Sequence, residues 1–560
     1  MLNVADIVSE ELKKHVKHIF MLTGYGAMYL NDSVERAGIK FIASRNEAAA
    51  PMMAEAYAKI NKNIGAVCVT AGPGSTNAIP GLAEAYVDSA PIVIISGQVE
   101  SKFTTDKYKN YKIRSFGVAE FSISEAIKKF SKHSKTINDP YLCLYELQKA
   151  IYIAKSGRPG PVWIEIPLDI QSFKIKSPKN LKKFVNPKQK TKNLNHKEFF
   201  RYLEKSKRPV LLFGNGIKQS NSESLALNFA KLCDIPFMLS RFANDICPYS
   251  NKLNLGQVGI KGQPYNSEII NKSDLVISFG CRFAPTLTMG NPKNFAKNAK
   301  KIMIDIDKIS SRHPLLKIDK FFNYDLNFFL KSILKKIKLY NIKSNNKNLW
   351  KKYCQKTKLG NQIEFINNSS NPIDLYHFMY TLNKLSKKSS IFTNDAGSNY
   401  YVGGQAWHYE KKQIEIASST NAAMGLSLPL SIGAAIARPK NQIISVTGDG
   451  SIELNIQELK TISHYNLNIK TFVINNGGYA SMTNWQDTFF EGNRLDTAEK
   501  TGVGTLNFKK IAEAYNLKYQ LIEKSSEIQK KISKILNDND PYLVEVVTKK
   551  NQKIIGTEIG

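Results

Sequence analysis

The stretch VTGDGSIELN, residues 446–455, follows the apolar run QIIS and ends it in Gly-Asp-Gly. The apolar run predicts a buried β-strand, and the two glycines allow the backbone to come close to a bulky ligand. Asp449 lies between them and is expected to project its carboxylate at the carboxyl edge of a sheet, where open α/β folds hold ligands. A plain strand-to-helix turn with Asp449 as the helix cap gives the same pattern, so the rest of the chain has to decide.

A second motif, NNGGY at 475–479, is separated from Gly450 by 24 residues, and the interval has room for one helix and one strand. A parallel crossover of this kind returns Asn475 and Asn476 to the sheet edge that carries Asp449. A carboxylate, an amide oxygen and a backbone carbonyl form a hard, all-oxygen site, which suits Mg²⁺ bound through a diphosphate. The helix that follows Ser451 is expected to direct its N-terminus at the phosphates.

Short apolar runs alternate with helical patterns along the chain, which indicates parallel α/β sheets. With 560 residues the chain is too long for one core, and the polar stretches 174–196 and 341–372 divide it. We expect three doubly wound parallel-sheet domains: 1–173, 197–340 and 373–560. The expected strands are 65–70, 91–97, 161–167, 209–216, 274–280, 301–307, 390–397, 442–450, 469–476 and 542–548.

The composition narrows the classes of function. The formal net charge is +32, a balance that often indicates a nucleic-acid partner. Here the excess is mostly Lys spread along the chain, and no stretch interleaves basic and aromatic residues, so we expect no nucleic acid. No signal-peptide core and no apolar run of membrane-spanning length occurs, so we expect a cytoplasmic protein without a membrane partner. The six cysteines contain no C-x-x-C pair, which argues against a disulfide framework or a zinc site.

Gly-Asp-Gly followed after 24 residues by Asn-Asn resembles the diphosphate-binding motif of thiamine diphosphate enzymes. Four further blocks, in the same order, resemble those of acetolactate-synthase-like proteins: ASRNEAAAPMMAEAYAK, TAGPGSTNAIPGLAEAYVDSAPIVIISGQ, SGRPGPVWIEIPLDIQ and MGLSLPLSIGAAIA. The resemblance covers nearly the whole chain and implies pyrimidine-binding, central and diphosphate-binding domains. It implies an enzyme that uses Mg²⁺ and thiamine diphosphate. Such an enzyme decarboxylates a 2-oxo acid such as pyruvate and transfers the acyl-anion equivalent to a carbonyl acceptor, which the sequence does not identify.

The resemblance also implies roles for individual residues. Asp449, Asn476 and the Gly478 carbonyl would bind Mg²⁺. Glu47, in RNEAAA, would be catalytic: a carboxylate there hydrogen-bonds the pyrimidine ring of the cofactor and favours its imino tautomer. Taken alone, Glu47 reads as an acid at a helix N-terminus. The other implied cofactor contacts are Pro73, Asn77, Gly397, Ser398, Asn399, Met424, Gly448, Gly450, Ser451 and Tyr479. In this family the site forms between the first domain of one subunit and the third of another, which implies a homodimer or homotetramer.

The chain departs from the synthase pattern around the expected substrate pocket. Tyr25 stands in a turn that is often Gly-Gly, and Ala119 replaces the Gln of the F-Q-E stretch. Thr286 stands where the closing Arg of R-F-D-D-R would be, whereas Trp485 matches the synthase tryptophan that shapes the acceptor pocket. In the central domain FGNGIKQ, residues 213–219, has only two glycines of a dinucleotide turn, so FAD is possible but less favoured.

Two other functions stay open. A non-ligating 2-oxo acid decarboxylase or carbon–carbon lyase would use the same cofactor, although no His-His pair occurs near 105–125 to protonate its intermediate. A basic nucleic-acid-binding or scaffold protein on the same fold is the more remote alternative. It has no need for Glu47 and Asp449 together.

Overall fold

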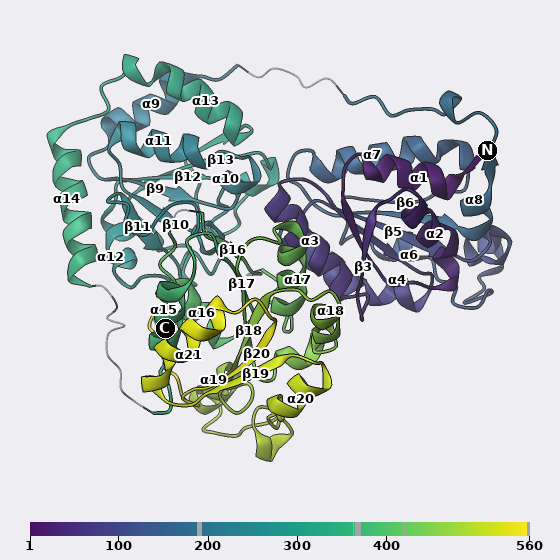
Figure 1. Cartoon of the computed structure of the whole chain (residues 1–560). Coiled ribbons are helices and arrows are strands. Elements are labelled where there is room, and N and C mark those ends of the chain that lie inside the picture. The colour runs from purple at the N-terminus through teal and green to yellow at the C-terminus, as the bar shows by residue number, and fades with distance from the viewer. Residues whose placement is uncertain (188–192, 362, 364–370, 411, 419, 557–560) are drawn as a thin grey trace.

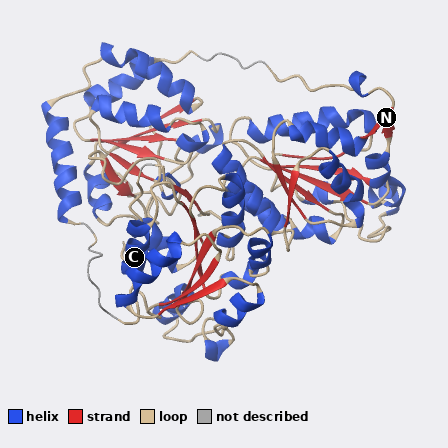
Figure 2. Cartoon of the chain, viewed as in Figure 1, coloured by secondary structure: helices blue, strands red, loops and turns tan. Residues whose placement is uncertain are grey.

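The computed structural model describes residues 1–187, 193–361, 363, 371–410, 412–418 and 420–556. Within these residues the chain forms three sheets of six parallel strands, each flanked by helices (Figures 1 and 2). A short antiparallel pair, β1 (Leu2–Asn3) with β8 (Lys174–Ile175), lies beside the first sheet. The expected α/β fold with three parallel-sheet domains is confirmed.

The N-terminal sheet has the order β3-β2-β4-β5-β7-β6, and all six strands are parallel. The direction in which successive strands are added across the sheet reverses between β2 and β4. Ligands of open α/β sheets bind at the carboxyl ends of the strands beside such a reversal. Its strands are β2 (His18–Met21), β3 (Lys40–Ala43), β4 (Gly65–Val69), β5 (Ile92–Gln98), β6 (His133–Thr136) and β7 (Val162–Pro167). Its helices are α1 (Val4–Lys13), α2 (Met28–Arg36), α3 (Ala49–Asn61), α4 (Pro73–Asn77), α5 (Ile79–Val87), α6 (Ile123–Ala126), α7 (Cys143–Lys155) and α8 (Leu168–Ser172).

The central sheet has the order β11-β10-β9-β12-β13-β14, with its reversal between β9 and β12. Its strands are β9 (Pro209–Phe213), β10 (Phe237–Leu239), β11 (Asn254–Gln257), β12 (Leu275–Phe279), β13 (Lys300–Asp305) and β14 (Lys320–Asn323). Its helices are α9 (His196–Lys205), α10 (Gly216–Gln219), α11 (Glu223–Cys233), α12 (Tyr265–Lys272), α13 (Leu326–Lys336) and α14 (Asn345–Gly360). Helix α14 lies in the expected linker 341–372 but buries Trp350 and Cys354 against this domain.

The C-terminal sheet has the order β16-β15-β17-β18-β20-β19, with its reversal between β15 and β17. Its strands are β15 (Ile391–Asn394), β16 (Ile414–Ile416), β17 (Ile443–Gly448), β18 (Ile469–Asn475), β19 (Lys518–Ile522) and β20 (Tyr542–Val547). Its helices are α15 (Leu375–Leu385), α16 (Ser398–Ala406), α17 (Ser427–Ala437), α18 (Glu458–His464), α19 (Ala480–Phe489), α20 (Phe508–Ala514) and α21 (Ile528–Asn537).

Helices α3 and α17 join the N-terminal and C-terminal domains at the centre of the molecule (Figure 1). Both are apolar nearly all round, which is typical of a helix buried on every side. At Gly433 in α17 a Cβ atom would lie 2.1 Å from the Met53 carbonyl oxygen of α3, so only glycine allows this approach. One hydrophobic core therefore spans the two domains.

The six cysteines are buried, unpaired thiols. Among the described residues, no helix combines the length and the apolar composition that crossing a bilayer requires.

Candidate active site

The two motifs of the C-terminal domain meet at the carboxyl ends of β17 and β18, where Gly448 pairs with Ile474. Asp449 is 2% exposed, and its Oδ2 accepts the N–H groups of Gly477 and Gly478, both at 2.9 Å. Both glycines have positive φ, of +84° and +121°, which turns these N–H groups towards the carboxylate. Burial raises the pKa of Asp449, and the backbone donors act in the opposite direction. The carboxylate is thus fixed at the sheet edge that the sequence predicts.

The oxygen atoms beside Asp449 fit a hard cation. The Oδ1 atom of Asn476 is buried and has no hydrogen-bond partner within the described residues, an arrangement that costs free energy unless a ligand satisfies the oxygen. The Gly478 carbonyl accepts the Ala480 N–H at 3.0 Å and keeps a second lone pair. Asp449, Asn476 and Gly478 together offer the oxygen donors that Mg²⁺ prefers.

The start of α16 forms another wall of this site. Gly397 precedes the helix with φ +103°, and no side chain caps the helix N-terminus, so its N–H groups are available to an anion. The Ser398 hydroxyl lies 3.2 Å from that of Ser481. The Asn399 amide donates to Asn394 Oδ1 at 2.8 Å and to the Asp395 carbonyl at 3.1 Å. Its predicted contact with a diphosphate therefore stays a prediction.

A buried aspartate that the sequence analysis missed links this helix start to two other segments. Asp395 Oδ2 accepts the Thr447 hydroxyl at 2.8 Å, and Oδ1 accepts the Leu426 N–H at 3.3 Å. Asp395 follows β15 directly, so its position after a strand in the sequence NDAG was the available signal. It holds the ends of β15 and β17 and the start of α17 together.

The remaining predicted contacts of the C-terminal domain surround the same turn. The Ser451 hydroxyl accepts the Gly425 N–H at 3.0 Å and so ties the turn to the half-buried Met424. At Gly450 a Cβ atom would lie 2.4 Å from the Tyr479 ring, so the ring covers this glycine. The roles of these residues towards a cofactor stay predictions.

Glu47 lies in the loop between β3 and α3, at the carboxyl edge of the N-terminal sheet. Asn77 at the end of α4 donates its amide to Glu47 Oε2 at 3.3 Å. At Gly74 a Cβ atom would lie 3.4 Å from Glu47 Oε1 and 2.6 Å from the Thr70 methyl group. Pro73 starts α4 and is exposed. The structure thus brings the predicted catalytic residue together with the predicted pyrimidine contacts.

Two of the predicted substrate-pocket residues, Tyr25 and Ala119, lie beside the loop between β4 and α4, which leads to Pro73. Tyr25 is 70% exposed, and its neighbour Gly26 donates its N–H to the Thr70 hydroxyl at 3.0 Å. Ala119 has φ +57°, and its carbonyl oxygen lies 2.4 Å from where Gly72 would place a Cβ atom. Glycine at position 72 is therefore required for the 118–120 segment to approach the loop.

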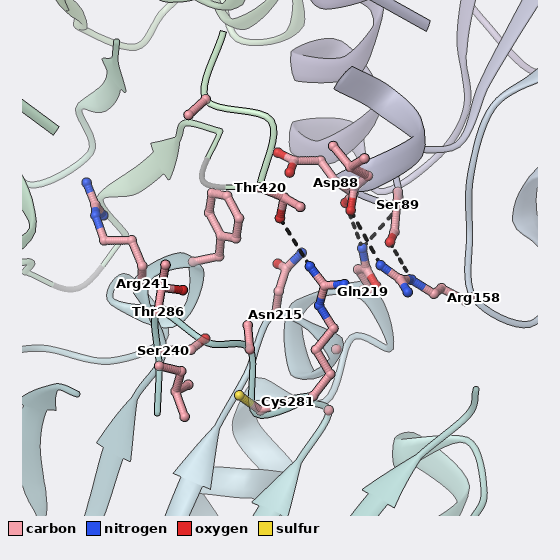
Figure 3. A pocket seen from close by; sticks show the side chains of 18 of the residues that line it. Asp88, Ser89, Arg158, Asn215, Gln219, Ser240, Arg241, Cys281, Thr286 and Thr420 are labelled. Atoms are coloured by element: carbon pink, nitrogen blue, oxygen red, sulfur yellow. Dashed lines mark hydrogen bonds between the residues drawn. The ribbon is translucent and has the colours of Figure 1, made fainter. Parts of the chain in front are cut away.

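The other two, Thr286 and Trp485, line a cavity of about 2470 Å³ to which all three domains contribute (Figure 3). Among the described residues that line it, neither Glu47 nor Asp449 occurs. No hydrogen bond or ion pair between described residues links the Glu47 group in the N-terminal domain to the Asp449 group in the C-terminal domain. The predicted residues therefore form two halves of a site, with no direct hydrogen bond or ion pair between the halves in the described part of the chain.

Two arginines that the sequence analysis missed bring positive charge to this cavity. The Arg158 Nε donates to the Ser89 hydroxyl at 2.7 Å, and Arg282 Nη2 donates to the Thr420 hydroxyl at 3.3 Å (Figure 3). Burial lowers the pKa of Arg282, and the charge of Arg158 lowers it further. Arg158 also pairs with Asp307 at 3.7 Å, and Asp88 and Asp305 raise the pKa of Arg282, so carboxylates beside the cavity offset part of this positive charge.

The glycines of FGNGIKQ have a structural explanation next to this cavity. At Gly214 a Cβ atom would lie 2.1 Å from the Gly280 carbonyl oxygen, and at Gly216 it would lie 2.7 Å from the Gly280 Cα. The ends of β9 and β12 therefore pack so closely that both positions need glycine. Their presence alone does not indicate a phosphate-binding turn.

Three sequence models of one enzyme family match the chain. "Thiamine pyrophosphate enzyme, N-terminal TPP binding domain" matches residues 2–134, the central-domain model of the same family matches 197–315, and the C-terminal TPP binding domain matches 395–546. Acetolactate synthase 2 of Nicotiana tabacum chloroplasts is 29% identical over 98% of this chain and 83% of its own length. The acetolactate synthase large subunit of Buchnera aphidicola from Schizaphis graminum is 31% identical over 94% and 90%. A probable acetolactate synthase large subunit of Methanococcus aeolicus is 29% identical over 97% and 92%.

Proposed function

Since the chain belongs to the thiamine pyrophosphate enzyme family as an acetolactate-synthase-like carboligase, we propose that it binds Mg²⁺ with the cofactor and uses pyruvate as the donor. The observation that carries the metal is the buried, unpartnered Asn476 Oδ1 beside the fixed Asp449 carboxylate. When bound, thiamine diphosphate supplies the carbon nucleophile of this chemistry.

The chain's own residues divide the work between the two halves of the site. Asp449, Asn476 and Gly478 hold the metal that neutralises the diphosphate. Glu47 presents its carboxylate to the pyrimidine position for proton transfer, and the Asn77 amide orients that carboxylate through Oε2. The α16 N-terminus adds backbone N–H groups for the phosphates.

A homodimer would bring the two halves together. In one chain they are separate, and each has exposed apolar side chains beside it. Around Ala119 in the sequence, the exposed side chains are those of Phe116, Val118 and Phe121. Around Trp485 in the sequence, they are those of Met482, Phe489 and Phe490. Exposed apolar clusters of this kind are typical of protein–protein contacts, and a two-fold arrangement would bury both sets. We therefore propose that the N-terminal half of one subunit completes the C-terminal half of the other.

FAD is the further cofactor that the resemblance offers for the large cavity. The glycines of FGNGIKQ lend it little support, because packing against Gly280 already requires them. The volume of the cavity and the two positive charges of Arg158 and Arg282 at it support a large anionic ligand more strongly. The absorption spectrum of the purified protein tests this: flavin bands that persist through gel filtration support FAD, and a colourless protein contradicts it.

The acceptor is expected to differ from a second molecule of pyruvate. A synthase holds the acceptor carboxylate with an arginine, whereas Thr286 offers one neutral hydroxyl. Arg241, in the same cavity, already pairs with Glu415 and stacks on the Tyr400 ring. Losing a charged contact of this kind costs on the order of 2–5 kcal/mol, or roughly 30- to 5,000-fold in binding. We propose an aldehyde or a keto-sugar as the acceptor.

Product analysis tests this proposal. The enzyme is incubated with pyruvate alone and with a panel of aldehyde, ketone and sugar acceptors, and Thr286→Arg is assayed alongside. We expect slow acetolactate formation from pyruvate alone, faster ligation to another acceptor, and more acetolactate from the variant. Acetolactate turnover of several per second by the parent would contradict the changed acceptor. Release of acetaldehyde without ligation to any acceptor would favour the non-ligating decarboxylase.

A further inference from the structure

Helix α18 of the C-terminal domain holds the loop that carries Glu47 in the N-terminal domain of the same chain. Glu458, the first residue of α18, is fully buried. Its Oε1 accepts the backbone N–H groups of Arg45 at 2.8 Å and Asn46 at 3.1 Å. These are the two residues directly before Glu47, so a carboxylate from another domain fixes the backbone on one side of the predicted catalytic residue.

Two further side chains, one within α18 and one at its C-terminal end, contact the start of this loop. The Tyr465 hydroxyl accepts the Ala43 N–H at 2.9 Å. Thr461 donates its hydroxyl to Glu458 Oε2 at 2.7 Å and lies 3.4 Å from the Ala43 carbonyl oxygen. Glu458, Thr461 and Tyr465 are called the α18 latch below. The latch thus accepts the backbone N–H groups of Ala43, Arg45 and Asn46.

The chain also fixes the other side of Glu47. Asn46 Oδ1 accepts the Ala48 N–H at 2.9 Å, which closes a short turn around Glu47 at the start of α3. Because the latch holds the Asn46 N–H and the Asn46 side chain holds the Ala48 N–H, the backbone of Glu47 lies between two fixed neighbours. The Glu47 carboxylate can then be held in place by a single amide contact, that of Asn77.

A buried carboxylate is costly unless donors compensate it. Burial raises the pKa of Glu458, and the Thr461 hydroxyl and the two backbone N–H groups act in the opposite direction. The charge of Arg45 lowers the pKa of Glu458 further. A neutral apolar residue at position 458 would pack in the same core at lower cost but would leave the Arg45 and Asn46 N–H groups without their acceptor.

We propose that Glu458 is a positioning residue for Glu47, and that the α18 latch sets the direction of the catalytic carboxylate. This inference rests on the proposed catalytic role of Glu47. Helix α18 begins nine residues after Asp449 in the sequence. Precise orientation matters because a displacement of about 1 Å in a reacting group costs roughly 100-fold in rate.

The test compares Glu458→Ala, Glu458→Gln and Tyr465→Phe with the parent enzyme. Glu146→Gln serves as the matched control, because Glu146 is a buried carboxylate of α7, outside the residues assigned to the site. Hydrogen–deuterium exchange of the 43–48 segment is measured without cofactor. Turnover, the KM for pyruvate and calorimetric affinity for thiamine diphosphate with Mg²⁺ are measured on the loaded enzyme.

For Glu458→Ala we expect exchange in 43–48 to rise about tenfold or more, because two charge-assisted hydrogen bonds are lost. The kcat should fall roughly 10- to 100-fold, while the KM and the cofactor affinity change less than about threefold. Glu458→Gln keeps the oxygen that accepts both N–H groups and should recover most of both losses. Tyr465→Phe should raise exchange at the Ala43 end and lower the kcat by a smaller factor, and Glu146→Gln should match the parent.

Unchanged exchange in 43–48 for Glu458→Ala would overturn the latch. Parallel loss of kcat, pyruvate KM and cofactor affinity without rescue by Glu458→Gln would show an ordinary structural contact and overturn the positioning role. If Glu458→Ala does not fold, Tyr465→Phe decides, and parent-like exchange and kcat in that variant overturn the proposal. Full activity of Glu47→Gln would instead remove the proposed function and leave the exchange result as the measure of the latch.

Discussion

At the scale of single residues, Asp449 shows how the chain prepares a charge before a ligand arrives. Two N–H groups of the Gly477–Gly478 turn and that of Gly450 hold its carboxylate in a buried position. Charge-assisted hydrogen bonds of this kind are about twice as strong as neutral ones. The carboxylate therefore needs no rearrangement to meet a metal, and the free Asn476 oxygen beside it supplies a second donor.

Asp449→Ala should remove metal-dependent binding of thiamine diphosphate, because the diphosphate loses its main charge bridge to the protein. We expect affinity to fall roughly 100-fold or more, measured by calorimetric titration with and without Mg²⁺. Asp449→Asn is the matched control, since it keeps the shape and removes the charge, and it should lose most of the Mg²⁺ dependence. An unchanged affinity in the alanine variant would contradict the site.

Glu47→Gln should leave the cofactor bound but lower turnover roughly 100-fold or more, because the amide keeps the contact with Asn77 and loses the carboxylate. Calorimetry measures the first property and steady-state turnover with pyruvate and its acceptor measures the second. Activity within a factor of a few of the parent would exclude Glu47 from the chemistry.

At the scale of elements, β7, an interior strand next to the edge of the N-terminal sheet, carries a buried carboxyl group. Glu165 accepts the Thr136 hydroxyl at 2.6 Å and the Gln98 amide at 3.0 Å, and burial raises its pKa from 4.5 to about 7. The folded state therefore favours the protonated form more than the unfolded state does. The stability that this group contributes is full below about pH 4.5 and is lost as the pH rises towards 7.

In the Glu165→Gln variant the side chain at this position stays neutral at every pH. The free energy of unfolding of the variant, relative to that of the parent, should therefore increase between pH 5 and pH 8. The difference should reach up to about 3 kcal/mol, the energy equivalent of the raised pKa. Thermal unfolding at both pH values measures it: the midpoints should be similar at pH 5, and the variant should be several degrees higher at pH 8. A constant difference at both values would show that Glu165 is ionised in the folded protein.

The sequence allowed prediction of the long apolar strands but not of the polar edges. The ten expected strands are all interior strands, as β17 and β18 are, because uninterrupted apolar runs have no alternative to burial. The interior strands β2 and β10 were missed, because runs of four and three residues are too short to give this pattern. Short edge strands such as β3 and β6 are half exposed and polar in part, so they carry no such pattern. Asp449 and Asn476 could be placed together because a parallel crossover fixes where a strand ends. Glu458 and Arg282 could not, because their hydrogen-bond partners come from other domains, and Arg158 could not, because its ion-pair partner Asp307 lies in the central domain.

At the scale of the whole molecule, three parallel sheets meet around one large cavity, and the N-terminal and C-terminal domains share a core through α3 and α17. Within one chain this packing fixes the Glu47 loop to α18 but leaves Glu47 without a bond to the Asp449 turn. A second copy of the chain is the partner that would complete each half. The central claim is therefore that an active site needs Glu47 from one subunit and Asp449 from the other.

Co-expression of Glu47→Gln and Asp449→Ala chains tests this claim most directly. Each variant alone should be inactive. If sites form between subunits, a hybrid dimer has one doubly damaged site and one intact site, so a random mixture should recover about a quarter of the parent turnover. If each chain builds its own site, every site in the hybrid carries one damaged residue. A mixture in which the two variant chains form hybrid dimers but no turnover is recovered would contradict the account.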